Sequence, residues 1–321
     1  MRSYKILYNG GTHPGMQRTN NEDAYIQQTI WDERHLLSVV IDGVGGYEGG
    51  ERAAEIAQDS IIAYLNKSPN GERLDLLKQA VTEANNKIYE ERNSEKQFPN
   101  MSCVLTACLV ELEKEVINMV HVGDTRLYQF RRNELKKLSH DHSLVGYREE
   151  IGNLTEEEAM HHPERNMINR LVGDKLHEID DCDFLEADTF PLSPNTTLML
   201  CSDGLFDMIT SAEISSVLNQ EIPLDSKVDN LIQLANEKGG NDNITVALIE
   251  YIEDSDEQQI NKREEESLSH QTVNETPKKS GKNKISHDKQ KTNSLLKQML
   301  FVLIAFLLGF SVGWFMNKII Y

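Results

Sequence analysis

The segment LLSVVIDGVGGYEGG, residues 36–50, decides how this chain folds. Its first part, Leu36 to Ile41, is an apolar, β-branched run that predicts a buried strand. The strand is predicted to end at Asp42, and glycine occupies five of the next eight positions, which is typical of a loop. From about Glu51 onward, apolar residues recur at the spacing of one helical face. The sequence therefore predicts a strand, a glycine-rich loop and a helix in succession.

The rest of the N-terminal part of the chain extends this pattern. A second helix is predicted over residues 74–92, directly after the first, and two successive helices argue against a doubly wound sheet. From Ser102 onward, the apolar residues follow the pattern of β-strands. Further strands are predicted at residues 104–110, 116–122, 126–130, 134–138, 197–201 and 244–251. Strands grouped apart from helices indicate an α+β sandwich.

Acidic residues follow several of these predicted strands at the point where each strand stops. The five acidic positions are Glu22-Asp23, Asp42-Gly43, Asp124, Asp203-Gly204 and Asp242-Asn243. Asp-Gly and Asn-Gly are also common in turns, so a single position of this kind indicates little. Several carboxylates on one sheet rim would repel one another unless divalent cations lay between them. Oxygen ligands without Cys or His favour hard cations such as Mg²⁺ or Mn²⁺.

Charge and cysteine content narrow the class of protein. The chain carries a formal net charge of −19, and residues 1–252 contain 43 acidic and 23 basic residues. A domain this acidic repels nucleic acid, so we expect no nucleic-acid partner. The four cysteines form no Cys-x-x-Cys pair. Free thiols in apolar, strand-like surroundings behave as small hydrophobic residues, which indicates a reduced, cytosolic compartment.

Seven short motifs follow one another along residues 12–250. They are Thr12–Ala24, Asp42–Gly46, Val122–Arg126, Leu138–Ser143, His162–Gly173, Cys201–Asp207 and Gly240–Thr245. Together they resemble the PPM family, the metal-dependent type 2C serine/threonine protein phosphatases, in the style of its bacterial members. The resemblance implies an αββα sandwich, with two antiparallel sheets between helical layers, over a phosphatase domain of residues 1–252. We expect this catalytic domain to be monomeric.

The resemblance also implies the ligands of two metal ions, Mn²⁺ or Mg²⁺. Asp42 would bridge the two ions. Asp203 and Asp242 would hold one of them, while Glu22 and the backbone carbonyl of Gly43 would hold the other. Two such ions activate a water that hydrolyses phosphoserine or phosphothreonine by in-line attack.

Three further residues receive roles from the same resemblance. Asp23 would accept hydrogen bonds from waters on the metal ions, and Asp124 with Asp203 would hold a weaker third ion. Arg18 would grip the substrate phosphate, since a guanidinium can do so in bidentate fashion. Arg18 and Asp42 are thus the predicted catalytic residues.

One departure from the family pattern leaves the general acid unidentified. Many eukaryotic members carry His where this chain has Val44, and valine cannot donate a proton. The alternative hypothesis is an inactive PPM-like domain that binds phosphoproteins at a membrane. An inactive relative usually lacks one or more metal ligands, whereas Glu22, Asp42, Asp203 and Asp242 are all present.

A helical insertion is predicted over residues 146–171, corresponding to the flap of the family. Thr155 to Glu158 is typical of a capping box. His140 and His142 could indicate a metal site. Alternate residues in a strand point to opposite faces, so we expect a structural or flap-supporting role for both.

The C-terminal part of the chain differs from the rest in composition. Residues 253–298 lack apolar periodicity and predict a disordered polar linker. Residues 299–316 contain no charge, and as a helix they would extend over roughly 27 Å, enough for a transmembrane helix, assigned to residues 299–318. Seven lysines precede this span between residues 278 and 297, which predicts a single-pass membrane protein with a cytoplasmic catalytic domain. Its expected partners are phosphorylated proteins, including a membrane Ser/Thr kinase and the substrates of that kinase.

Overall fold

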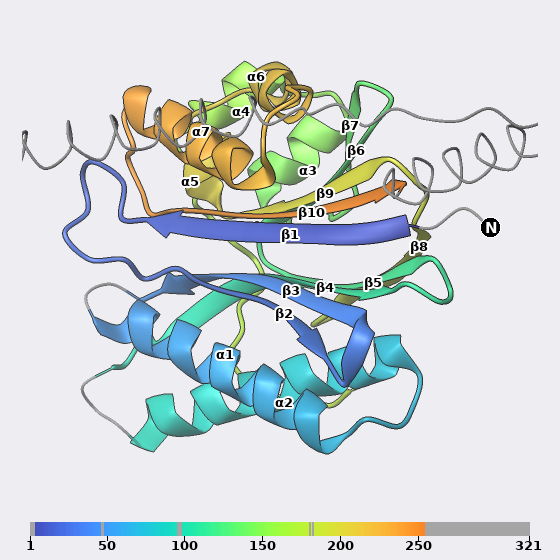
Figure 1. Ribbon diagram of the computed structural model, residues 1–321. Coiled ribbons are helices and arrows are strands. Elements are labelled where there is room, and N and C mark those ends of the chain that lie inside the picture. Colours follow the sequence, from blue (N-terminus) through green and yellow to red (C-terminus); the bar gives the residue numbers. More distant parts are fainter. Residues whose placement is uncertain (1–3, 46–47, 95–97, 180, 182, 254–321) are drawn as a thin grey trace, which may run out of the picture. The chain divides into compact units, whose positions relative to one another are not determined.

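Two antiparallel β-sheets pack face to face between two layers of helices in the computed structural model (Figure 1). The structure describes residues 4–45, 48–94, 98–179, 181 and 183–253. The arrangement confirms the predicted α+β class and the sandwich of two antiparallel sheets flanked by helices. Among the described residues, no helix is long and apolar enough to cross a membrane. The predicted transmembrane helix, and all of the predicted linker beyond residue 253, lie outside the described residues.

The first sheet joins the two ends of the described chain. In spatial order it contains β1 (Tyr4–His13), β10 (Ile244–Glu253), β9 (Thr196–Cys201), β6 (Arg126–Arg131) and β7 (Glu134–Lys137). Its outer face is covered by the C-terminal helices of the described part (Figure 1). These helices are α5 (Asp203–Phe206), α6 (Ser211–Leu218) and α7 (Leu224–Glu237).

The second sheet contains the buried apolar run Leu36–Ile41. It contains β2 (Ala24–Ile30), β3 (Asp32–Val44), β4 (Ser102–Glu111), β5 (Val116–Val122) and β8 (Glu186–Pro191). Its outer face is covered by α1 (Glu48–Lys67) and α2 (Arg73–Ser94) (Figure 1). Every residue of β4 is buried, because the helices cover one side of this strand and the first sheet covers the other. That is why the strand is a continuous apolar run without alternation.

Two short helices form the predicted insertion between β7 and β8. They are α3 (Leu144–Glu150) and α4 (Glu156–Met160). We call residues 144–170 the flap. The predicted capping box is confirmed, because Thr155 and Glu158 exchange side-chain to backbone hydrogen bonds at the start of α4. The base of the flap is closed by an isolated bridge between Ser143 and Ile168.

Antiparallel pairing explains why acidic residues from distant segments meet at one rim. Ala24, at the start of β2, pairs with Ile41 near the end of β3, so Asp23 lies next to Asp42. In the other sheet, Val246 near the start of β10 pairs with Cys201 at the end of β9. The loops that carry the remaining acidic residues therefore emerge on the same side. β3 continues to Val44, two residues beyond its predicted end.

Candidate metal centre

The rim where β3 and β9 end, and where β2 and β10 begin, encloses a cavity of about 190 Å³. Six of the eight predicted site residues line it. They are Arg18, Glu22, Asp42, Gly43, Asp203 and Asp242. Val44, the residue that departs from the eukaryotic pattern, also lines this cavity. The structure thus brings together side chains from four separate parts of the chain.

The two remaining predicted residues lie beside this cavity. The Asp23 carboxylate accepts hydrogen bonds from the hydroxyls of Ser202, at 2.8 Å, and Thr245, at 2.6 Å. Asp124 lines an adjoining cavity of about 30 Å³. This smaller cavity also includes Asp203, so the position predicted for a weaker third ion borders the main site.

The carboxylates of this site repel one another and few protein groups offset their charge. Within the described part of the chain, the Asp42 and Asp203 carboxylates have no hydrogen-bond or ion-pair partner. Burial, together with neighbouring carboxylates, raises the pKa of both well above the ordinary value. Burial likewise raises the pKa of Asp23 and of Asp124 to about 7. An oxygen-only ligand set with this excess of negative charge fits hard divalent cations.

The backbone at Gly43 allows Glu22 and Asp42 to approach each other. The Gly43 N–H donates to the Glu22 carbonyl over 3.2 Å. A Cβ atom at this position would lie 2.3 Å from the carbonyl oxygen of Gly50 and 2.6 Å from that of Glu22. Only glycine fits there, so its own carbonyl can reach a ligand held by Glu22.

Arg18 is the cationic side chain at the mouth of the cavity. Its guanidinium donates to the Asp242 carboxylate over 2.8 Å, and 53% of its side chain remains exposed. An ion pair this exposed stabilises the fold little. The guanidinium is therefore available to bind an anion that enters the cavity.

Two asparagines of the site were not predicted. Asn20 donates from its amide to the Glu22 carboxylate over 2.9 Å. The Asn243 side chain accepts from the Glu22 N–H over 2.8 Å and donates to the carbonyls of Pro14 and Asn20. Asn243 thus fixes the Glu22 loop from a position 221 residues away. Both asparagines stand in the quoted motifs, yet no sequence spacing indicates the contact between them.

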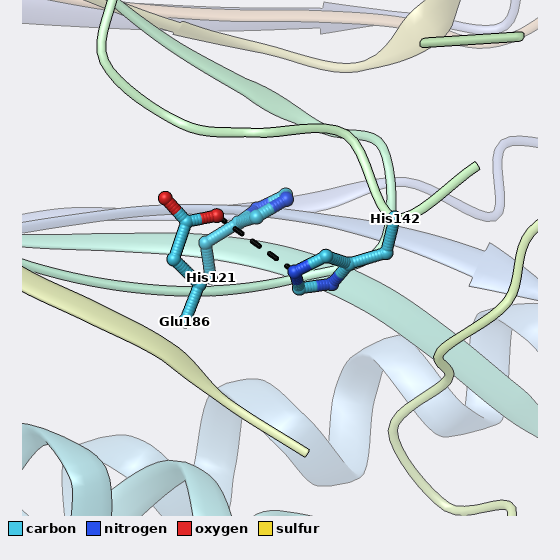
Figure 2. A group of neighbouring side chains, drawn as sticks. All are labelled: His121, His142 and Glu186. Carbon is cyan, nitrogen blue, oxygen red and sulfur yellow. Dashed lines mark ion pairs between the residues drawn. The ribbon is translucent and has the colours of Figure 1, made fainter. Parts of the chain in front are cut away.

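A second group of possible metal ligands lies nearby but is already hydrogen-bonded. Ligand-type atoms of His121, His142 and Glu186 lie within 4.8 Å of one another (Figure 2). His121 Nε2 donates to the Gly123 carbonyl over 3.0 Å, and its other ring nitrogen lies 2.9 Å from the Thr106 hydroxyl. His142 Nδ1 accepts from the Gly123 N–H over 3.0 Å. The two rings therefore bond the carbonyl and the N–H of Gly123, the residue before Asp124.

The strand-based expectation for His140 and His142 was wrong, because β7 ends at Lys137 and neither residue lies in a strand. Both rings instead turn toward one acidic residue. His140 Nδ1 lies 2.8 Å from the Glu186 carboxylate, and His142 Nε2 lies 3.7 Å from it. The predicted structural role of His142 is nevertheless confirmed by its bond to the Gly123 backbone.

A rim of acidic residues around one cavity, with an exposed arginine at its mouth, is the arrangement expected of a metal-dependent phosphoryl-transfer enzyme. Comparison with known proteins agrees. The profile of the family described as Protein phosphatase 2C matches residues 11–249. The chain therefore belongs to the protein phosphatase 2C family, and it is a metal-dependent serine/threonine protein phosphatase.

Named proteins that are similar to this chain match it over nearly their whole length. The serine/threonine phosphatase stp of Listeria welshimeri is 33% identical over 245 residues, which are 74% of this chain and 93% of that protein. Protein phosphatase PhpP of Streptococcus pneumoniae is 32% identical over 251 residues, 77% of this chain and 98% of that protein.

Solved structures agree with the fold. The serine/threonine phosphatase of S. agalactiae has a TM-score of 0.68 at 33% identity, covering 77% of this chain and 99% of that one. The catalytic domain of the phosphatase PstP, solved in complex with two manganese ions, has a TM-score of 0.66 at 27% identity, covering 78% of this chain and 100% of that one. These likenesses favour an active enzyme over an inactive phosphoprotein-binding domain.

Proposed function

We propose that this chain hydrolyses phosphoserine and phosphothreonine esters of other proteins at the cavity described above. One observation carries the proposal. Glu22, Asp42, Asp203 and Asp242, spread over 221 residues of sequence, line a single cavity together with Arg18.

The acidic residues divide between two cation positions. Glu22 and the Gly43 carbonyl would hold one Mn²⁺ or Mg²⁺ ion, Asp203 and Asp242 would hold the other, and Asp42 would contact both. When bound, the two ions supply an acidified water as the nucleophile and offset the charge of the phosphoryl group. The two manganese ions of the PstP catalytic domain support this stoichiometry.

Three further residues act around this pair. Arg18 exchanges its contact with Asp242 for the substrate phosphate, which it orients for in-line attack. Asp23, fixed by Ser202 and Thr245, would accept hydrogen bonds from waters on the metal ions. Asp124 would hold a weaker third ion together with Asp203; the adjoining cavity that both residues line supports this assignment.

We also propose that residues 299–318 anchor the enzyme in a membrane, with the catalytic domain in the cytoplasm. The support is the uncharged run 299–316 and the lysines that precede it. Tethering would raise the effective concentration of the enzyme near membrane-bound phosphoproteins, such as a Ser/Thr kinase and its substrates. Cell fractionation tests this: the full chain should sediment with membranes, and a chain ending at residue 298 should not.

The activity is tested by incubating the full chain with Mn²⁺ and a phosphothreonine peptide. We expect release of inorganic phosphate that EDTA abolishes. Asp242→Asn should reduce the release strongly, whereas Asp188→Asn, on the exposed surface of β8, should leave it unchanged. No EDTA-sensitive release from a panel of phosphopeptides would contradict the proposal.

A further inference from the structure

A larger groove lies along the flap, next to the active site. Its volume is about 800 Å³. One wall is formed by the flap, from Glu156 on α4 to Arg165, and the other by residues around Asp207 and the start of α6. The groove adjoins the active site, because Asn241 lines the groove and the next residue, Asp242, lines the active site. A polypeptide whose phosphorylated side chain enters the active site therefore has the groove beside its neighbouring residues.

Two contacts hold the flap against the opposite wall. The Glu156 carboxylate accepts from the Ser211 N–H over 2.7 Å and from the Ser211 hydroxyl over 2.6 Å. Arg165 donates to the Asp207 carboxylate over 2.8 Å. The groove is thus formed before any substrate arrives, as is usual for binding sites.

The groove offers apolar surface at Met160 and Met208. Methionine side chains are flexible and polarisable, so they adapt to aliphatic groups of different shape. A groove that must accept different protein substrates benefits from such a surface.

Among the described residues, one carboxylate that lines the groove is left without a partner, since that of Glu156 is already hydrogen-bonded to Ser211. Arg165 offsets Asp207, and Lys238 donates to Glu213, which lies outside the groove. Among the described residues, the side chain of Glu157 has no hydrogen-bond or ion-pair partner. It is exposed on the first turn of α4, where it lines the groove.

We infer that the groove binds the substrate polypeptide beside the phosphorylated residue, and that it prefers a lysine or arginine there; this rests on the proposed active site. The aliphatic stem of such a residue would lie on the methionines while its charged end meets Glu157. The excess of acidic over basic residues in the domain, 43 against 23 in residues 1–252, also attracts a basic segment.

The test uses the full chain with Mn²⁺ and a set of phosphothreonine peptides that differ at one flanking position. Arg, Ala or Glu is placed in turn at each of several positions on both sides of the phosphothreonine, and kcat/KM is measured. At one position at least, Arg should raise kcat/KM about fivefold over Ala, the size expected of a partly exposed ion pair. Glu at that position should lower it.

Variants of the flap then assign the preference to the groove. Glu157→Gln should remove it and Glu157→Lys should invert it. Glu164→Lys changes another exposed acidic residue of the flap that does not line the groove, so the preference should remain. Hydrolysis of p-nitrophenyl phosphate, which is too small to reach the groove, should be the same in all four proteins.

Each result has a distinct meaning. If Arg gives no advantage at any position, or if the advantage persists unchanged in Glu157→Lys, the inference is overturned. If the wild-type chain fails to hydrolyse p-nitrophenyl phosphate with Mn²⁺, the proposed active site itself is at fault. The two failures are therefore separable.

Discussion

Replacing Asp42 by asparagine should change the stability of this protein in opposite directions with and without divalent cations. Asp42 lies among Asp23, Asp203 and Asp242 and has no partner of opposite charge among the described residues. Asparagine has nearly the same shape but no charge. Without cations, the substitution therefore removes repulsion; with cations, it removes the ligand proposed to contact both ions.

The size of the effect can be taken from the neighbouring Asp23. Burial and adjacent carboxylates raise the pKa of Asp23 from 3.8 to about 7. At about 1.4 kcal/mol per pKa unit, this corresponds to a destabilisation of the metal-free fold by about 4 kcal/mol at neutral pH. Since the Asp42 side chain faces a cavity that water can enter, we expect about 1–2 kcal/mol of stabilisation in Asp42→Asn. That is a rise in Tm of about 2–8 °C for a domain of this size.

The assay is thermal unfolding in EDTA and in a series of Mn²⁺ concentrations. The wild type should gain about 4 kcal/mol when Mn²⁺ reaches about a thousand times its Kd, and Asp42→Asn should gain much less. Asp188→Asn, which is exposed on β8 and does not line the cavity, should follow the wild type in both conditions. A lower Tm of Asp42→Asn in EDTA, or an equal Mn²⁺ response in both proteins, would refute the electrostatic reasoning.

Two other substitutions test the site and its support. Arg18→Lys keeps the charge but loses bidentate phosphate binding, so kcat/KM for a phosphopeptide should fall about tenfold while Tm in EDTA changes by less than about 2 °C. Arg126→Met leaves the buried Asp141 carboxylate paired only with Lys137, so urea unfolding should report a loss of about 3 kcal/mol at pH 7. Burial raises the pKa of Asp141, but Arg126 and Lys137 outweigh it and hold that pKa below its ordinary value. The benefit of the pair is complete above the ordinary pKa of Asp141 and is lost as the pH falls through its lowered pKa in the folded protein, so the deficit of Arg126→Met should shrink only below about pH 4.

The strands and the acidic residues that follow them could be predicted because their signals are local. The run before Asp42 is apolar on both faces, and the glycines after it allow close approach of the backbone. The same holds for the strand that ends before Asp203. A strand buried between a helical layer and a second sheet has apolar residues on both of its faces. Its burial can therefore be predicted directly from the sequence.

The supporting contacts could not be predicted, because each joins residues far apart in the chain. Asn243 orients Glu22, and Glu156 of the flap holds Ser211 at the start of α6. Asparagine and glutamate at such positions are equally common in ordinary loops and helix ends. His142 was assigned a structural role for an incorrect reason, since its position depends on the loop geometry at Gly123 and not on a strand.

The sheets, and not the cations, bring the acidic residues together. The ladder between β2 and β3 reaches Ala24 and Ile41, each adjacent to an acidic residue, and β9 is paired through Cys201, two residues before Asp203. Backbone hydrogen bonds and three apolar cores thus fix the positions of charges that would otherwise separate. The repulsion remains as a cost of the metal-free fold. Cation binding relieves that cost in a site whose geometry already exists. The substitution Asp42→Asn should therefore stabilise the metal-free protein and destabilise the metal-bound protein.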